Sequence, residues 1–451
     1  MAQQSFISIS DPVIALEHVR IIDGTGAAVK SDQTIVIDHG KIAAIESAAS
    51  AAVPAGARRM DLSGHTVIPG LVGMHEHLFY PSGEGIPIYN EQAYSFPRLY
   101  LASGVTTART GGSMEPYTDL NVKARIDSGR DPGPDFYITG PYLEGAGSPI
   151  EQLHQLSGPD DARRTVEYWA AEGVTSFKAY MHITRAELAA AVEAAHKLGI
   201  KVTGHLCSIG FREAAAIGID NLEHGIEVDT EFDPGKRPDV CPSQTLTRDT
   251  LVKLDIQSAP VQEMIRDLVR HNVAITSTLA VFDAGAPHRP PFDPRIVDVL
   301  TPQGAISYLE ARTRATDSAS TAALESLKKE EQFEYAFARA GGLLMSGVDP
   351  TGNGGAMAGF GDLRNLELLA EAGFSPAEAV KIATLNGAKW LGADSRIGSI
   401  EKGKQADLVV IRGDPSTRIS DVRNVRMVFK NGAGYDPEKL IKSVNHTVGL
   451  H

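Results

Sequence analysis

Six side chains with the donor atoms of a metal site stand at, or close to, the ends of short apolar runs. In chain order they are His75, His77, Lys178, His205, His224 and Asp349. Side chains two positions apart on a strand point to the same face, so the first two imidazoles can converge on one ion. A single histidine in such a place is most simply a hydrogen-bonded residue. Six groups in order on five strand ends predict a metal centre, and imidazole and carboxylate ligands suit a divalent ion of the zinc type.

Lys178 needs a separate explanation, because an ammonium group has no lone pair and repels a metal ion. A lysine in a low-dielectric site loses its proton more readily. The neutral amine could then react with carbon dioxide to give a carbamate, an anion able to bridge two metals. The alternative is a lysine paired with Asp349 or with a substrate carboxylate.

The elements that must position these groups follow a regular alternation from Val67 onward, where short apolar runs precede amphipathic helical stretches such as 186–199. This pattern is typical of parallel strands joined by crossover helices. The eight runs are Val67–Met74, Val105–Thr110, Phe136–Gly140, Ser176–Tyr180, Lys201–His205, Asn221–His224, Ala274–Leu279 and Leu343–Asp349. They predict an α/β fold, a (β/α)8 TIM barrel, whose catalytic groups lie at the C-terminal ends of the strands.

Both ends of the chain carry a β pattern instead. Alternating apolar residues and glycine-containing turns extend from about Val13 to Gly64, and β-type segments return after residue 391. We therefore expect a barrel over 65–391 and a small β-sandwich domain assembled from 1–64 and 392–451. Two connections, 226–258 and 281–322, are long and polar or proline-interrupted, which is typical of lids and binding loops.

Composition excludes several classes of protein. The formal net charge of the 451 residues is −13, and no dense run of lysine and arginine occurs, so we expect neither a nucleic-acid nor a membrane partner. The two cysteines, Cys207 and Cys241, are too few for a disulfide framework or a four-thiolate zinc site. Without a basic and apolar leader, the chain is expected to be cytoplasmic, unless an export signal has been removed.

Several segments resemble the amidohydrolase superfamily. They are PGLVGMHEH, GVTTARTGG, SFKAY, GHLCSIG, LEHG and SGVDPTG, followed by SPAEAVKIATLNGAKWLG and GSIEKGKQADLVVI. The nearest likeness is to the imidazolonepropionase-related branch that includes Xaa-Pro dipeptidases, acylamino-acid carboxypeptidases and ochratoxin-type amidases. The resemblance implies a binuclear metal-dependent hydrolase that forms homo-oligomers and acts on a small-molecule amide.

The resemblance also implies roles for the six groups. His75, His77 and Asp349 would hold the more buried of two divalent ions, most simply Zn²⁺. His205 and His224 would hold the more exposed ion, and Lys178, carboxylated by carbon dioxide, would bridge both. Asp349 would act as the catalytic base, accepting a proton from the hydroxide-forming water between the metals and returning it to the leaving amine.

The substrate-reading segments depart from the family pattern. The second strand ends in Ala108-Arg109-Thr110, and the third and fourth are followed by Tyr142 and by Tyr180-Met181-His182-Ile183. Arg109 could bind a substrate carboxylate or form a buried ion pair. Tyr142, Tyr180 and His182 could donate to the oxyanion or simply pack at the rim. Cys207, with no base assigned to it, is expected to pack as a small residue.

Three functions remain open on the sequence alone. The first is hydrolysis of an amide such as an N-acyl amino acid, a dipeptide or an ochratoxin-type amide. The second keeps the fold but opens a cyclic amide or lactam, cleaves a carbamate or an ester, or deaminates. The third is a non-catalytic scaffold, which the presence of all six groups disfavours. Two, one or no bound metal ions per chain would distinguish the three.

Overall fold

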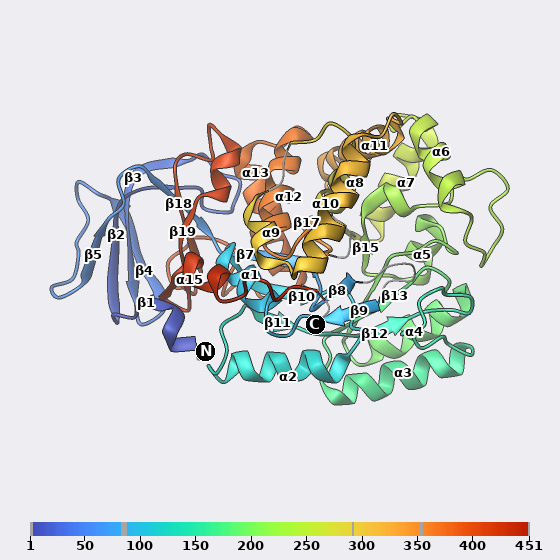
Figure 1. The fold of residues 1–451 in the computed structure, drawn as a ribbon, viewed down its shortest axis with the longest axis horizontal. Coiled ribbons are helices and arrows are strands. Elements are labelled where there is room, and N and C mark those ends of the chain that lie inside the picture. Colours follow the sequence, from blue (N-terminus) through green and yellow to red (C-terminus); the bar gives the residue numbers. More distant parts are fainter. Residues whose placement is uncertain (1–2, 83–87, 291–292, 351–354, 450–451) are drawn as a thin grey trace.

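The computed structural model of the chain describes residues 3–82, 88–290, 293–350 and 355–449. It has a mixed α/β fold with strands near its centre and helices around them (Figure 1). The helices are α1 (Phe96–Ala102), α2 (Pro116–Asp127), α3 (Pro159–Glu172), α4 (Arg185–Lys197), α5 (Phe211–Ile217), α6 (Gln244–Lys253), α7 (Ala259–Arg270), α8 (Leu279–Gly285), α9 (Arg295–Val299), α10 (Pro302–Thr316), α11 (Ala322–Arg339), α12 (Phe360–Glu371), α13 (Pro376–Lys381), α14 (Gly387–Trp390) and α15 (Pro437–Lys442).

Two parallel sheets occupy the position of the predicted barrel. The first has the order β11-β10-β7, and the second runs from β12 through β17 in sequence order. Their strands are β7 (Leu71–Glu76), β10 (Val105–Thr110), β11 (Asp135–Tyr137), β12 (Thr139–Leu143), β13 (Ser176–Ala179), β14 (Lys201–Gly204), β15 (Asn221–Glu223), β16 (Ala274–Ser277) and β17 (Leu344–Ser346). Every predicted run overlaps at least one of these strands. The predicted third run is divided into β11 and β12.

The two parallel sheets meet at both of their ends. Ser113, just after β10, forms a parallel bridge with Pro141 of β12. On the other side the backbone N–H of Asp349, after β17, donates to the carbonyl oxygen of His75 in β7 at 2.9 Å. These two contacts bring the C-terminal ends of strands that are far apart in sequence to one place. They explain why the predicted ligands converge there.

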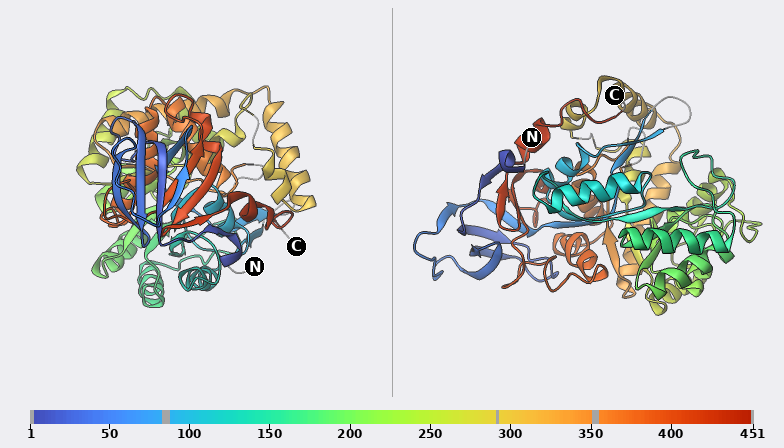
Figure 2. Two further views of the ribbon diagram at one scale, coloured as in Figure 1. Left: turned by 90° about the vertical axis from the view of Figure 1, so that its left-hand side faces the viewer. Right: turned by 90° about the horizontal axis from the view of Figure 1, so that it is seen from below.

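The strands from the two chain ends form a separate sheet, as the sequence predicted. Its order is β1-β20-β19-β18-β6-β2-β3-β4, and β5 pairs with β2. Its strands are β1 (Ile7–Ile9), β2 (Val13–Ile21), β3 (Lys30–Asp38), β4 (Lys41–Ser47), β5 (Arg58–Asp61), β6 (His65–Pro69), β18 (Leu408–Arg412), β19 (Val425–Lys430) and β20 (Ala433–Tyr435). The N-terminal strands in blue lie beside the C-terminal strands in red (Figure 2).

Hydrogen bonds join the nine terminal strands into one sheet. The β-sandwich arrangement expected for these segments stays a prediction. Apolar side chains from both chain ends nevertheless share one core, in which Leu16 and Ile35 lie with Leu408 and Phe429. Strand β6 belongs to this sheet and β7 to the parallel one, so the predicted run Val67–Met74 is divided at Gly70. A Cβ atom at Gly70 would lie 2.1 Å from Oγ1 of Thr106, which leaves room only for glycine.

The two long connections contain helices rather than extended loops. Helix α6 lies within 226–258, and helices α9 and α10 lie within 281–322. Cys207 and Cys241 form a disulfide, so the expectation that Cys207 serves only for packing was wrong. The bond ties the segment after β14 to the 226–258 connection. Among the described residues, no helix combines the length and apolar character needed to cross a membrane.

Candidate metal centre

The C-terminal ends of the parallel strands place the six predicted residues around one point. His75 lies on β7 and Lys178 on β13, while His77, His205, His224 and Asp349 follow β7, β14, β15 and β17 within three residues. His224 and Asp349 have backbone φ angles of 69° and 47°. Residues other than glycine rarely adopt this left-handed conformation, and strained backbone is concentrated at functional sites.

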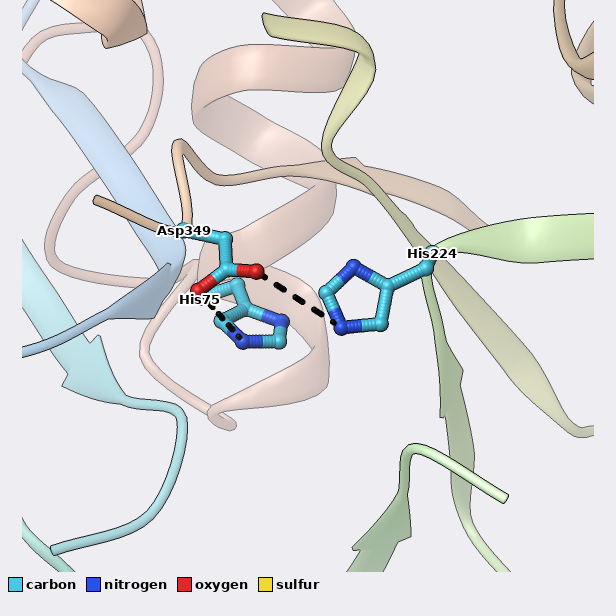
Figure 3. A group of neighbouring side chains, drawn as sticks. All are labelled: His75, His224 and Asp349. Carbon is cyan, nitrogen blue, oxygen red and sulfur yellow. Dashed lines mark ion pairs between the residues drawn. The ribbon is translucent and has the colours of Figure 1, made fainter. Parts of the chain in front are cut away.

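Asp349 lies at the centre of the group. One carboxylate oxygen, Oδ1, is 3.2 Å from Nε2 of His77 and 3.6 Å from Nε2 of His75, and Oδ2 is 3.8 Å from Nε2 of His224. Figure 3 shows the carboxylate between the rings of His75 and His224, with one oxygen turned toward each. Ligand atoms of these three residues all lie within 4.8 Å of one another, so they are close enough to contribute to a common metal centre.

Lys178 and His205 complete the group. Nζ of Lys178 is 3.5 Å from Nε2 of His75. The ring of His205 lies 4.6 Å from that of His224 between centroids. Four of the six side chains are almost fully buried, with His75, His77 and Lys178 at 1% exposure. The structure therefore brings together every residue that the sequence predicted as a metal ligand.

The second ring nitrogen of three histidines is fixed by a neighbour. Nδ1 of His75 lies 2.8 Å from Oε2 of Glu223, Nδ1 of His77 lies 3.2 Å from the carbonyl oxygen of Gly112, and Nδ1 of His224 lies 2.7 Å from Oγ1 of Thr278. A proton on each Nδ1 leaves the Nε2 lone pair for the ion and sets the orientation of the ring. Sequence reasoning missed Glu223, although it directly precedes His224 in LEHG.

Arg109 does not lie at the rim of the site. Its buried position excludes the predicted direct contact with a substrate carboxylate. It is fully buried, and Nη2 lies 2.6 Å from Oε1 of Glu223 and also donates to the carbonyl oxygen of Met74. Arg109 thus forms the buried ion pair that was the alternative on the sequence. A substrate could reach the guanidinium only by breaking this pair, which is costly for a buried charge.

Burial keeps the imidazole ligands in the form that binds metal. It lowers the pKa of His75 to about 4 and that of His205 to about 3, and the nearby Lys178 adds to both effects. Burial also lowers the pKa of Lys178 to about 8. Burial acts to raise the pKa of Asp349, but His75 and the hydrogen bond from His77 hold it well below its usual value. The imidazoles are thus neutral and the aspartate is ionised near neutral pH.

The three predicted rim residues lie near the centre or beside it. The ring of Tyr142 is 6.4 Å from that of His77, and the ring of Tyr180 is 5.2 Å from that of His205. The backbone N–H of His182 donates to Oε1 of Glu144 at 2.7 Å, and its ring faces the other oxygen of this buried carboxylate at 3.4 Å. The tyrosines therefore contact predicted ligands, while His182 is held by Glu144.

The donor set fits a divalent cation of the zinc type, because it combines neutral imidazoles, an ionised carboxylate and a buried amine. His75, His77 and Asp349 could share one ion, and His205 and His224 a second. Such an ion would polarise a carbonyl oxygen and lower the pKa of a bound water. The arrangement is therefore suited to hydrolysis.

Comparisons with known proteins agree with this chemistry. The sequence model of the amidohydrolase family matches residues 66–433. A dihydroorotase of Pelotomaculum thermopropionicum is 24% identical over 89% of this chain and 90% of its own. A Xaa-Pro dipeptidase structure with bound methionine superposes with a TM-score of 0.70 at 22% identity, over 94% of this chain and 100% of the other. The ochratoxinase of A. niger superposes with a TM-score of 0.64 at 17% identity, over 94% and 95% of the chains. At these identities the two structures show similarity of fold alone.

Proposed function

Since the chain belongs to the amidohydrolase family, whose members are metal-dependent hydrolases of carbon–nitrogen bonds, we propose that it cleaves the amide bond of a small molecule at a binuclear metal centre. The observation that carries this proposal is the convergence of four imidazoles, the Lys178 amine and the Asp349 carboxylate at one end of the parallel strands. The N-acyl amino acids, dipeptides and ochratoxin-type amides remain the first substrate classes to test.

Different residues would bind the metals, transfer the proton and donate a hydrogen bond to the substrate. His75, His77 and Asp349 would hold one ion, His205 and His224 the other, and a carbamate on Lys178 would bridge them. Two Zn²⁺ ions would supply an acidified water and polarise the amide carbonyl. Asp349 would accept the proton of that water on a carboxylate oxygen and return it to the leaving amine nitrogen. Tyr142 and Tyr180 are candidates to donate a hydrogen bond to the oxygen of the attacked carbonyl.

The carbamate is supported by the environment of Lys178. The side chain is buried at 1% exposure beside His75, and burial lowers its pKa to about 8. A neutral amine is the form that reacts with carbon dioxide, and the resulting anion would offset the charge of two cations. An ammonium in the same place would repel them.

The two parallel sheets are proposed to form one closed (β/α)8 barrel. The bridge between Ser113 and Pro141 and the hydrogen bond between Asp349 and His75 join the sheets at both ends. A barrel over 65–391, with the terminal sheet as a second domain from 1–64 and 392–451, is our proposal for the domain organisation. A homo-oligomer also stays a prediction, which analytical ultracentrifugation would check.

Opening of a cyclic amide is the second candidate function. It is favoured by the similarity to a dihydroorotase along 89% of the chain. A carbamate on Lys178 that holds two ions argues against it, because this candidate is expected to use a single metal ion. Metal content therefore separates the two candidates.

The experiment that tests the proposal combines metal analysis with a substrate screen. Protein loaded with zinc in bicarbonate is expected to bind two ions per chain and to hydrolyse at least one N-acyl amino acid, dipeptide or anilide in a panel that also contains lactams and carbamates. One ion with activity on lactams alone would favour the second candidate. Two bound ions with activity on esters or lactones alone would contradict the assignment to amides.

A further inference from the structure

An aromatic and apolar cluster borders the predicted metal ligands, and Phe79, Tyr142 and Leu153 in it are only 0%, 5% and 9% exposed. It consists of Phe79, Tyr89, Tyr142, Leu153 and Tyr180, and is called the aromatic wall below. Phe79, Tyr142 and Leu153 are buried in one hydrophobic cluster, and the partly buried Tyr89 and Tyr180 pack against it. The wall has a mixed origin, because it combines the hairpin of β8 (Phe79–Ser82) and β9 (Ile88–Glu91) with β12, the segment after it and the end of β13.

The aromatic wall contacts ligands of both proposed ions. The ring of Phe79 stacks on that of His77 with 4.3 Å between centroids, and Tyr180 contacts the ring of His205 at 5.2 Å. Tyr142 links the two sides, because its ring lies 4.8 Å from that of Tyr180 and 6.4 Å from that of His77. A group attached to an amide at the metals would therefore lie against this wall.

Two charged or titratable groups near the aromatic wall are already paired. Arg109 is fully buried and bound to Glu223, and His182 is held by Glu144. Within the described part of the chain, the cations that stack on rings do so elsewhere, such as Arg98 on Tyr94 and Lys201 on Trp390. The wall thus presents ring faces, one leucine and tyrosine hydroxyl groups, and no lysine or arginine belongs to it.

We propose that the aromatic wall binds an uncharged aromatic or aliphatic group next to the scissile amide, so that the enzyme prefers neutral amides to analogues with a free carboxylate there. This inference rests on the proposed function and narrows its substrates, because N-acyl amino acids and dipeptides, which carry a carboxylate beside the amide, would be poorer substrates than their neutral analogues. Burial of apolar surface against aromatic rings is favourable. Transfer of a carboxylate from water to a surface without a cation is costly.

The test compares amides that differ only by a carboxylate. One pair is N-acetyl-2-phenylethylamine and N-acetylphenylalanine, and the other is N-methylbenzamide and N-benzoylglycine. We expect kcat/KM of zinc-loaded protein to be at least about tenfold higher for the neutral member of a pair. Equal or higher kcat/KM for the carboxylated members would overturn the inference while leaving amide hydrolysis itself intact.

Binding separates failure of the inference from failure of the proposed function. Calorimetric titration of the same four compounds needs no turnover, so it decides the preference even for a protein that hydrolyses none of them. We expect the neutral members to bind at least about tenfold more tightly. Equal binding within a pair, tighter binding of the carboxylate, or binding of none of the four would each overturn the inference.

Two variants test whether the aromatic wall causes the preference for neutral amides. Tyr89→Arg places a cation in it and is expected to reduce the preference for the neutral members by about tenfold. Tyr117→Arg is the matched control, because Tyr117 lies on α2 outside the wall and is 48% exposed. Leu153→Ala should lower kcat/KM for N-methylbenzamide by a larger factor than that for N-methylacetamide. An unaltered preference in both wall variants would contradict the proposed role.

Discussion

Glu223 forms a hydrogen bond with the ring of His75, one of the predicted metal ligands. Its Oε2 lies 2.8 Å from Nδ1 of His75, and its Oε1 lies 2.6 Å from Nη2 of Arg109. Burial acts to raise the pKa of Glu223, but the guanidinium of Arg109, with His75 and Lys178, holds it well below the usual value. The carboxylate is therefore ionised, and it can fix both the tautomer and the orientation of His75.

Replacement of Glu223 by glutamine should weaken metal binding. An amide cannot accept from both His75 and Arg109, so the ring of His75 loses its fixed orientation. We expect zinc affinity, measured by competition with a chelator, to fall roughly 10–100-fold. The free energy of unfolding of the metal-free variant, measured with urea, should also fall by about 3–5 kcal/mol, because Arg109 is left buried without a counter-charge.

Controls separate the two effects of this substitution. In the double variant Arg109→Met/Glu223→Leu no buried charge is left unpaired, so stability should recover while zinc affinity stays low. Asp407→Asn changes a buried carboxylate just before β18, which accepts from the backbone N–H of Asn431, and should leave zinc affinity unchanged. Wild-type zinc affinity in Glu223→Gln would show that Glu223 does not orient His75.

Asp349→Asn should separate metal binding from turnover. Asparagine keeps an oxygen ligand within reach of His75, His77 and His224, but it cannot accept the proton of the attacking water. We expect kcat to fall roughly 10²–10⁴-fold while much of the bound zinc is retained. Metal analysis and turnover of the same preparation check this. A variant with nearly wild-type turnover would remove Asp349 from the role of base.

Lys178 should make activation depend on carbon dioxide and pH. With its pKa lowered to about 8 by burial, roughly a tenth of the amine is neutral at pH 7. At fixed dissolved carbon dioxide, the rate at which metal-free protein regains activity with zinc should rise about tenfold per pH unit below pH 8 and then level off. Stopped assays after timed additions of zinc measure this rate.

The neighbouring strand offers a control for this prediction. Lys178→Met should abolish the dependence on carbon dioxide together with most of the zinc binding. Lys201→Met, on β14, should retain both, because Lys201 bonds to the carbonyl oxygen of Trp390 instead. Full activation of the wild type in buffer free of carbon dioxide would exclude the carbamate.

The sequence predicted well which six residues lie together, because each stands at or close to the end of a short apolar run, where position along the chain determines position in space. Glu223 and Glu144 were missed, since their roles depend on partners that lie 148 and 38 residues away, His75 and His182. The ion pair of Arg109 could not be chosen over a substrate contact, because the sequence does not say how deeply the end of β10 is buried. The disulfide was missed because spacing alone does not bring Cys207 to Cys241.

Glu334 should make the stability of the protein fall as pH rises. It is fully buried on α11, and burial raises its pKa to about 8 in spite of the hydroxyl of Ser277. The folded protein therefore binds a proton that the unfolded chain releases above about pH 4.5. Between these two pH values, deprotonation of the unfolded chain lowers the free energy of unfolding as pH rises.

Glu334→Gln removes this dependence. At pH 8 the variant should exceed the wild type in unfolding free energy by roughly 1–3 kcal/mol, and the difference should shrink toward pH 5. Urea unfolding of metal-free protein at both pH values measures it. Glu325→Gln, an exposed position of α11, serves as control and should change neither value. A constant difference between pH 5 and pH 8 would contradict the raised pKa.

Reduction of the disulfide should destabilise the fold without emptying the metal centre. Cys207 and Cys241 are 34 residues apart, and a loop of that length corresponds to about 2–4 kcal/mol of stabilisation, largely through the entropy of the unfolded chain. The segments also remain joined by Thr230, whose hydroxyl donates to the carbonyl oxygen of Cys207 at 2.6 Å, and by Lys236, which donates to that of Ser208 at 2.6 Å. These bonds should keep His205 in place.

Cys241→Ser should therefore lower the urea midpoint as much as dithiothreitol lowers that of the wild type, with zinc content unchanged. Equal midpoints with and without reductant, or loss of zinc on reduction, would contradict this account.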